Sequence, residues 1–175
     1  MTSLLVLCTG NAARSVMAGF MLEHLHHELG GEPLHIVTAG THSVDGQPMS
    51  MRTRAALIRL PQLANADFRE HRSRQVHGID LVHADLVVVM EADHVRFVRR
   101  QFPGAAAKTG TLRRLCRDLA PPPPALVERV AALRLDGVEV TDEEDVLDPA
   151  GQDAEVYAAC ADELWTLCQQ LVVLL

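Results

Sequence analysis

The stretch from residue 8 to residue 15, Cys-Thr-Gly-Asn-Ala-Ala-Arg-Ser, constrains the fold of this chain more than any other. A continuously apolar run at residues 4–7 precedes it and an amphipathic segment follows it, which predicts a buried strand, a tight loop and a helix. A loop in that position directs its backbone N–H groups, and the positive end of the helix dipole, at one spot. The sequence therefore predicts an oxyanion-binding loop after the first strand.

The side chains of this loop fit the same chemistry. Cys8 would lie where the local field favours the thiolate, which makes a cysteine nucleophilic. Arg14 offers a planar fork that can hold two phosphate oxygens, and Ser15 adds a hydroxyl that can donate to the thiolate. Gly10 and Asn11 tolerate the positive φ angles that a loop around a phosphate needs. Each residue alone has an ordinary structural explanation, but their spacing between a strand and a helix indicates an oxyanion site.

The loop resembles that of the low-molecular-weight protein tyrosine phosphatases, which reads Cys-x-Gly-Asn-x-x-Arg-Ser. The chain matches it at Cys8, Gly10, Asn11, Arg14 and Ser15. Three further stretches resemble family segments: residues 38–41 (Thr-Ala-Gly-Thr), residues 71–76 (His-Arg-Ser-Arg-Gln-Val) and the Asp148-Pro149 pair before a long final helix. The resemblance spans nearly the whole chain apart from residues 117–145.

This resemblance implies a phosphatase that hydrolyses phosphorylated protein, of the phosphotyrosine monoester type, through a phosphocysteine and without a cofactor or metal. The implied catalytic residues are Cys8, Arg14 and Asp148: the cysteine attacks phosphorus, and the aspartate protonates the departing oxygen and then activates water. The implied phosphate-binding residues are Thr9, Gly10, Asn11, Ala12, Ala13, Arg14 and Ser15. The implied supporting residues are Asn11, Ser15 and Thr38, since family members use a serine at position 38 to brace the asparagine.

Three positions depart from the tyrosine-directed members of the family. Ala150 follows the Asp-Pro pair, where those members carry a tyrosine beside the substrate ring. Ala12 replaces a bulky aliphatic residue, or the threonine of phosphoarginine-directed relatives, and Ala13 replaces a second cysteine. A phosphoarginine phosphatase of the same fold remains an alternative. So does an arsenate reductase that uses an external small thiol, whereas the thioredoxin-coupled reductases need two more cysteines that residues 91–100 lack.

Composition sets the broad class of the protein. With 175 residues, 48% hydrophobic and 22% charged, the chain suits a single domain, residues 1–175, with an enlarged proline-rich and acidic excursion at about residues 117–145. A net charge of −7 argues against a nucleic-acid partner, and no apolar run is long enough to span a membrane. We expect a cytoplasmic protein whose cysteines are reduced. Its expected partners are phosphorylated protein or a small phosphate monoester, and its expected state is a monomer or weak homodimer.

Apolar periodicity predicts an α/β fold in which a four-stranded parallel sheet is covered by helices on both faces. Strands are expected at residues 3–7, 34–37, 85–90 and 108–112. Helices are expected after the phosphate loop to about Leu29, from Ser50 to about Leu60, before Pro103, near Leu126 to Leu133, and from Asp153 onward, with Cys160 in the core. Ligands of such sheets bind beyond the carboxyl ends of the strands, where Cys8, Thr38 and Glu91 would lie.

Three segments give weaker signals. Thr38 is expected to begin the loop after the second strand, and residues 61–79, rich in Arg and His, read as an irregular segment near the site. The acidic run at residues 142–145 reads as a solvated face.

Overall fold

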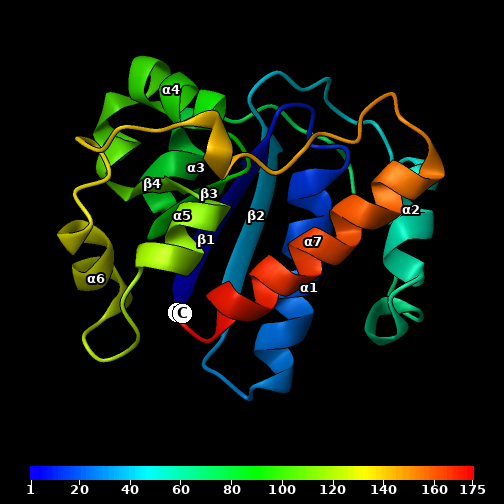
Figure 1. Cartoon of the computed structure of the whole chain (residues 1–175), viewed down its shortest axis with the longest axis horizontal. Helices are drawn as coiled ribbons and strands as arrows, with labels where there is room; N and C mark the ends of the chain where they lie inside the picture. The colour runs from blue at the N-terminus through cyan, green and yellow to red at the C-terminus, as the bar shows by residue number, and fades with distance from the viewer.

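The computed structural model describes residues 1–175 and contains one parallel sheet in the order β2-β1-β3-β4 (Figure 1). Its strands are β1 (Thr2–Cys8), β2 (Leu34–Gly40), β3 (Leu86–Val89) and β4 (Thr109–Thr111). All three strand pairs are parallel, with β1 between β2 and β3. The predicted α/β fold with a four-stranded parallel sheet is confirmed.

Strand β1 is apolar without alternation because helices cover both faces of the sheet. Leu4 and Val6 belong to a large core on one face, whereas Leu5 and Leu7 belong to a smaller core on the other. All four side chains are at most 1% exposed. Burial on both faces therefore explains the unbroken apolar run before the cysteine.

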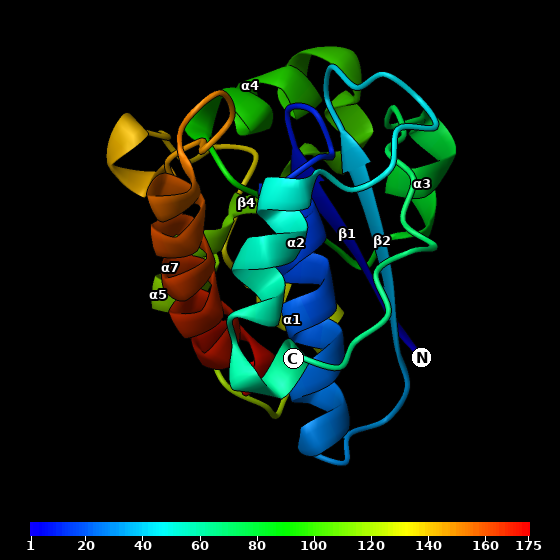
Figure 2. The ribbon, with the colours of Figure 1, turned by 90° about the vertical axis from the view of Figure 1, so that its right-hand side faces the viewer.

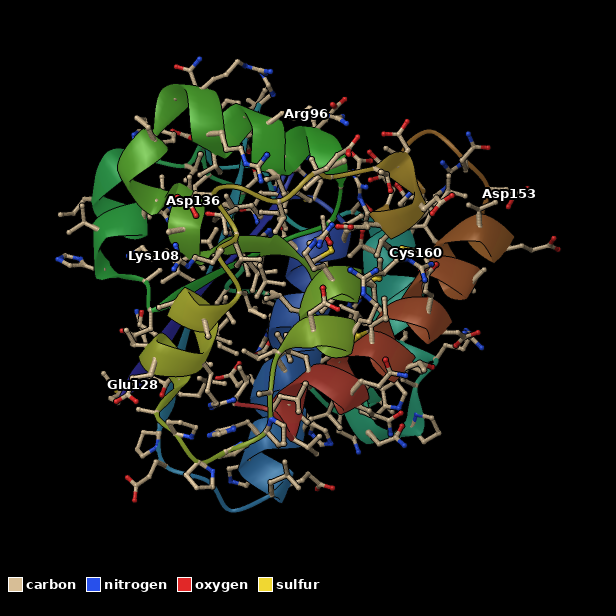
Figure 3. All side chains as sticks on the ribbon, turned by 60° about the vertical axis from the view of Figure 1, so that its left-hand side comes forward. Arg96, Lys108, Glu128, Asp136, Asp153 and Cys160 are labelled. Carbon is tan, nitrogen blue, oxygen red and sulfur yellow. The ribbon has the colours of Figure 1, made fainter.

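The larger core lies under helices that gather on one side of the sheet (Figures 1 and 2). These are α1 (Arg14–Glu28), α2 (Met51–Ile58), α5 (Leu112–Asp118), α6 (Leu126–Ala132) and α7 (Ala154–Val172). Helix α2 begins at the predicted N-cap, where the Ser50 side chain accepts a hydrogen bond from the Thr53 N–H. Helix α7 buries Cys160 as predicted, while Asp153 caps its exposed start (Figure 3).

The smaller core lies under α3 (Gly78–His83) and α4 (Ala92–Gln101). Helix α4 buries Val95 and Val98, as its apolar spacing predicted. Helix α3 was not predicted, because six residues are too few to show a helical period. It begins instead at a reciprocal cap between His77 and Asp80.

The remaining regular elements are short 3₁₀ helices at Pro61–Leu63, Pro103–Lys108 and Asp142–Glu144. None of the helices combines the length and the apolar character needed to cross a bilayer.

Two local predictions are wrong. Thr38 does not begin a loop, because β2 continues to Gly40 and pairs with β1 as far as Cys8. The acidic run is not wholly solvated, because Glu144 is 6% exposed and bonds to Arg114 and to the Thr111 hydroxyl. A carboxylate is buried there because charged and polar partners replace its hydration, which no local pattern reveals.

Candidate active site

The phosphate loop, residues 8–15, joins the carboxyl end of β1 to the first turn of α1. Asn11 has φ 51°, in the left-handed region that asparagine tolerates. The loop packs closely on the end of β2, where a Cβ on Gly40 would lie 2.5 Å from the Thr9 carbonyl oxygen. The glycine at position 40 is therefore required by the loop itself.

Side chains of Asn11 and Ser15 connect the Cys8 thiol to β2. The Asn11 Nδ2 donates to Ser15 Oγ and to Thr38 Oγ1, both at 3.0 Å, and Asn11 Oδ1 accepts from the Arg74 N–H. Ser15 Oγ lies 3.0 Å from Cys8 Sγ. Because Asn11 donates to the serine oxygen, the hydroxyl hydrogen of Ser15 remains free for the sulfur.

Three successive carbonyls of the loop are held from outside. The Ser43 hydroxyl donates to the Gly10 oxygen (2.9 Å), the His71 Nε2 to the Asn11 oxygen (3.1 Å) and the Thr53 hydroxyl to the Ala12 oxygen (2.8 Å). A trans peptide directs the next N–H opposite to its carbonyl, so the N–H groups of residues 11–13 face into the loop. These groups donate to no protein acceptor, which leaves them free for an oxyanion.

Arg14 is held at the other side of the loop, with 1% of its side chain exposed. Its Nη1 donates to Glu91 Oε1 (2.5 Å) and to the Val146 carbonyl (2.7 Å), and its Nη2 forms an ion pair with Asp148 Oδ2 at 2.9 Å. Both hydrogens of Nη1 are thereby used, out of the five of the guanidinium group. The Nε–H and the Nη2 hydrogens form no recorded hydrogen bond, and such an edge of a guanidinium group can bind an oxyanion through two parallel hydrogen bonds.

The structure thus brings Cys8, Arg14 and Asp148 to one place, although 134 residues separate Arg14 from Asp148. The Asp148 side chain is 39% exposed, so it faces the entrance rather than the core. Cys8 is 3% exposed. Thr9, Gly10, Ala12 and Ala13 contribute backbone, since their side chains are small or turned away.

Several residues around the site were not assigned a role from the sequence. Glu91 lies at the carboxyl end of β3, as expected, but its contact with Arg14 was not foreseen. His94 follows it by three residues in α4 and places Nε2 2.9 Å from Thr9 Oγ1. Burial, and then the charge of Arg14, lowers the pKa of His94 to about 3. The only local signal was the spacing of an acid and a histidine at the start of a helix after a buried strand.

The two sides of the entrance differ in character. On the Asp148 side, Ala150 is exposed and offers no ring to a substrate. On the Thr9 side, the His42 ring lies edge-on to Phe97, with 5.4 Å between ring centroids. The backbone N–H of His42 also donates to the Thr9 carbonyl, and this bond fixes the position of the aromatic pair relative to the loop.

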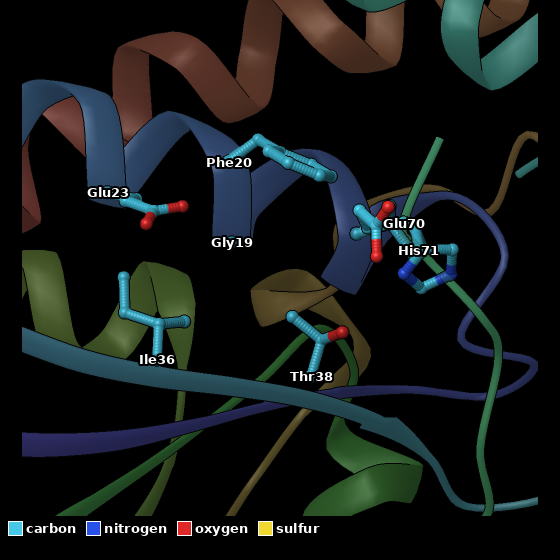
Figure 4. Close-up of a pocket in the computed structure, with 8 residues that line it drawn as sticks. Gly19, Phe20, Glu23, Ile36, Thr38, Glu70 and His71 are labelled. Atoms are coloured by element: carbon cyan, nitrogen blue, oxygen red, sulfur yellow. The ribbon is translucent and has the colours of Figure 1, made fainter. Parts of the chain in front are cut away.

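A groove of about 250 Å³ opens behind the loop, between α1 and the edge strand β2 (Figure 4). Its walls include Thr38 and His71, which support Asn11, and the carboxylates of Glu23 and Glu70. Neither Cys8 nor any other of the predicted catalytic residues lines it. The groove therefore borders the supports of the site and not its entrance.

Comparisons with known proteins agree with this geometry. A protein-arginine-phosphatase of Geobacillus stearothermophilus is 30% identical over 96% of this chain and 92% of its own length. A probable low molecular weight protein-tyrosine-phosphatase of Ralstonia nicotianae is 30% identical over 65% of this chain and 70% of its own. The crystal structure of a low molecular weight protein tyrosine phosphatase from T. tengcongensis is 28% identical, covers 98% of both chains and gives a TM-score of 0.77.

The model of the family described as low molecular weight phosphotyrosine protein phosphatase matches residues 3–121. This range contains the phosphate loop and ends before Asp148. The chain belongs to the low molecular weight phosphotyrosine protein phosphatase family.

Proposed function

We propose that the protein hydrolyses phosphate monoesters of phosphorylated protein, with Cys8 as nucleophile, Arg14 as phosphate ligand and Asp148 as general acid. The observation that carries this proposal is the set of free N–H groups at residues 11–13, directed into a loop that also holds a thiol. With the free edge of Arg14, they can bind the three non-bridging oxygens of a phosphoryl group.

The reaction would proceed in two displacements. Cys8 Sγ attacks phosphorus, the S–P bond forms, and the bond from phosphorus to the substrate oxygen breaks while Asp148 delivers a proton to that oxygen. Water then attacks the phosphocysteine, Asp148 takes its proton, and the S–P bond breaks to release phosphate and the thiolate. The Ser15 hydroxyl, 3.0 Å from the sulfur, stabilises the thiolate both before and after the cycle.

Phosphoarginine is the second candidate for the reacting group. The relative that aligns over 96% of this chain is named a protein-arginine-phosphatase, and the entrance lacks an aromatic wall at Ala150. The His42–Phe97 pair favours phosphotyrosine instead, because an aromatic ring can pack beside it. Phosphotyrosine stays the first substrate to test.

The test is a panel of an aryl phosphate, a phosphotyrosine peptide and a phosphoarginine peptide, with thiol-dependent arsenate turnover measured alongside. Acid quenching during turnover should trap a phosphate on Cys8, seen by mass spectrometry. Cys8→Ser should lose hydrolysis yet still bind phosphate or vanadate, because the amides and Arg14 remain. Retention of more than a few per cent of the activity by this variant would contradict the mechanism.

A further inference from the structure

A second hollow, of about 290 Å³, lies on the α2 side of the phosphate loop. We call it the arginine hollow, and it is lined by Pro48, Met49, Arg54, Phe68, Arg69 and Arg72. Phe68 is buried and Met49 is partly buried, so the floor is apolar while the rim carries guanidinium groups.

Two of the three arginines form no ion pair, although the charge of Arg54 also acts on the Asp67 carboxylate. Arg69 is paired with Asp67 at 2.6 Å, and hydrogen bonds from Arg69 lower the pKa of that carboxyl to about 2. Arg54 and Arg72 are exposed and form no ion pair. The Nη1 of Arg72 donates to the backbone carbonyls of Arg69 (2.8 Å) and His71 (2.7 Å), which orients the guanidinium and leaves its other N–H groups free.

Both unpaired arginines are adjacent in sequence to residues that touch the phosphate loop. Thr53, just before Arg54, donates to one loop carbonyl, and His71, just before Arg72, donates to another. The arginine hollow therefore adjoins the outer, carbonyl-bearing side of the phosphate loop, and a segment that flanks the phosphorylated residue would have to cross the rim of the loop to reach it.

The hollow stands out against the charge of its surroundings. The protein carries a net charge of −7, and the carboxylates of Glu91 and Asp148 flank Arg14 in the loop. The groove behind the loop has acidic walls and neighbours the hollow across the edge-to-face contact of Phe20 with Phe68. An acidic segment is thus attracted by the guanidinium groups of the hollow and repelled by the carboxylates in its surroundings.

We propose that the arginine hollow binds an acidic segment that flanks the phosphorylated residue of a protein substrate. Carboxylates of that segment would pair with Arg54 and Arg72, and an apolar side chain between them would lie on Met49 and Phe68. This inference rests on the proposed phosphatase function and narrows it to acidic phosphoprotein sites.

The experiment compares two phosphotyrosine peptides of equal length, one flanked by aspartates and one by serines. The wild-type protein should show a kcat/KM higher by on the order of five- to tenfold for the acidic peptide at low salt. This preference should shrink as salt rises toward about 0.5 M, because exposed charges are screened. In the double variant Arg54→Glu, Arg72→Glu the preference should vanish or reverse, with hydrolysis of a small aryl phosphate within about twofold of wild type.

The matched control is the double variant Arg100→Glu, Arg134→Glu, which changes net charge equally at two exposed arginines outside the hollow. It should keep the preference. Arg54→Glu alone and Arg72→Gln, checked by thermal melting, guard against a folding defect. An equal kcat/KM for both peptides in the wild type, or a preference that survives in the hollow variant, overturns the inference.

A peptide-binding measurement distinguishes failure of the docking inference from failure of the proposed phosphatase function. If the wild type hydrolyses the aryl phosphate without discriminating the peptides, the phosphatase stands and the docking surface does not. If no phosphate ester is hydrolysed, fluorescence anisotropy of both peptides on Cys8→Ser decides. Tighter binding of the acidic peptide that depends on Arg54 and Arg72 supports the docking surface, and equal binding rejects it.

Discussion

Arg14 has a guanidinium that is almost fully buried and still charged, because two carboxylates and a carbonyl surround it. A buried charge persists only where such partners compensate the lost hydration. The same contacts hold the free edge of the group in one orientation before any ligand arrives. Preorganisation of this kind lowers the reorganisation that a phosphoryl transfer requires.

Replacing Asp148 by Asn should harm poor leaving groups most. A leaving group of low pKa departs without a proton, so the loss in kcat should grow as the leaving-group pKa rises. A series of substituted aryl phosphates measures this slope. An equal loss across the series would mean that Asp148 acts through its contact with Arg14 and not as an acid.

The lowered pKa of His94 predicts that the folded protein loses stability in mild acid. Its folded-state pKa, lowered to about 3 by burial and Arg14, lies below the ordinary value of 6.5. As pH falls below 6.5, His94 becomes protonated in the unfolded chain but stays neutral in the folded protein. The free energy of unfolding should therefore fall by about 2 kcal/mol between pH 7 and pH 5 because of this residue.

Urea unfolding at both pH values tests this in wild type, His94→Gln and the exposed control His83→Gln. The acid-induced loss should be smaller by about 2 kcal/mol only in His94→Gln. If all three proteins lose the same free energy of unfolding, His94 is not kept neutral in the folded state.

At the scale of elements, α1 and β2 approach so closely that Gly19 has no room for a side chain. A Cβ there would lie 2.7 Å from Cγ2 of Thr38, whose hydroxyl holds Asn11. Gly19→Ala should therefore displace Thr38, loosen the phosphate loop and reduce kcat several-fold. Alanine gains about 1 kcal/mol of helix propensity, which offsets part of the stability cost.

Aryl phosphate kinetics and thermal melting measure both effects. The control is Gly104→Ala, where a new Cβ meets nothing within 4 Å. An unchanged kcat in Gly19→Ala would show that Thr38 does not position the loop through Asn11.

The segment that follows α6 is another element-scale determinant of the site. Glu144 is anchored to Arg114, and Asp145 Oδ1 accepts from the Ala92 N–H at the start of α4. These contacts bring the Val146 carbonyl to Arg14 and place Asp148 two residues further on. The acidic run therefore supports the site through packing.

At the scale of the whole molecule, the other three thiols are poorly suited to rescue an oxidised Cys8. Burial raises the pKa of Cys116 to about 11 and of Cys160 to about 12, and it also raises that of Cys168. Peroxide should then carry Cys8 past sulfenic acid to forms that dithiothreitol cannot reduce.

Time courses of peroxide inactivation, dithiothreitol recovery and mass spectrometry check this outcome. Ala13→Cys restores a thiol close to the nucleophile and should convert the loss into a reversible one through a disulfide. Full recovery of the wild type after prolonged peroxide, with a disulfide between Cys8 and one of the buried cysteines, would contradict the prediction.

Local order along the chain was readable from the amino-acid sequence. Strand β1, the phosphate loop and α1 follow from an apolar run, a set of anion-binding residue types and a helical period, all carried by neighbours in sequence. The Ser50 cap and the buried stripe of α7 are predictable for the same reason. The roles of Cys8 and Arg14 followed from the residue types of the loop, and the role of Asp148 came from resemblance to a family; all three stay predictions until tested.

Only the tertiary structure decided which distant groups meet. Glu91, Thr53 and His71 contact loop residues that are 41 to 77 positions away in the sequence. The sequence placed Glu91 and the segment of His71 near the site, but neither charge nor periodicity showed which loop atoms these side chains contact. Glu144 looked solvated until Arg114 was found beside it, because burial of a charge depends on its partner and not on its neighbours in sequence. The arginine hollow exists for the same reason: α2 and the segment after it place unpaired arginines side by side only once both pack against the phosphate loop.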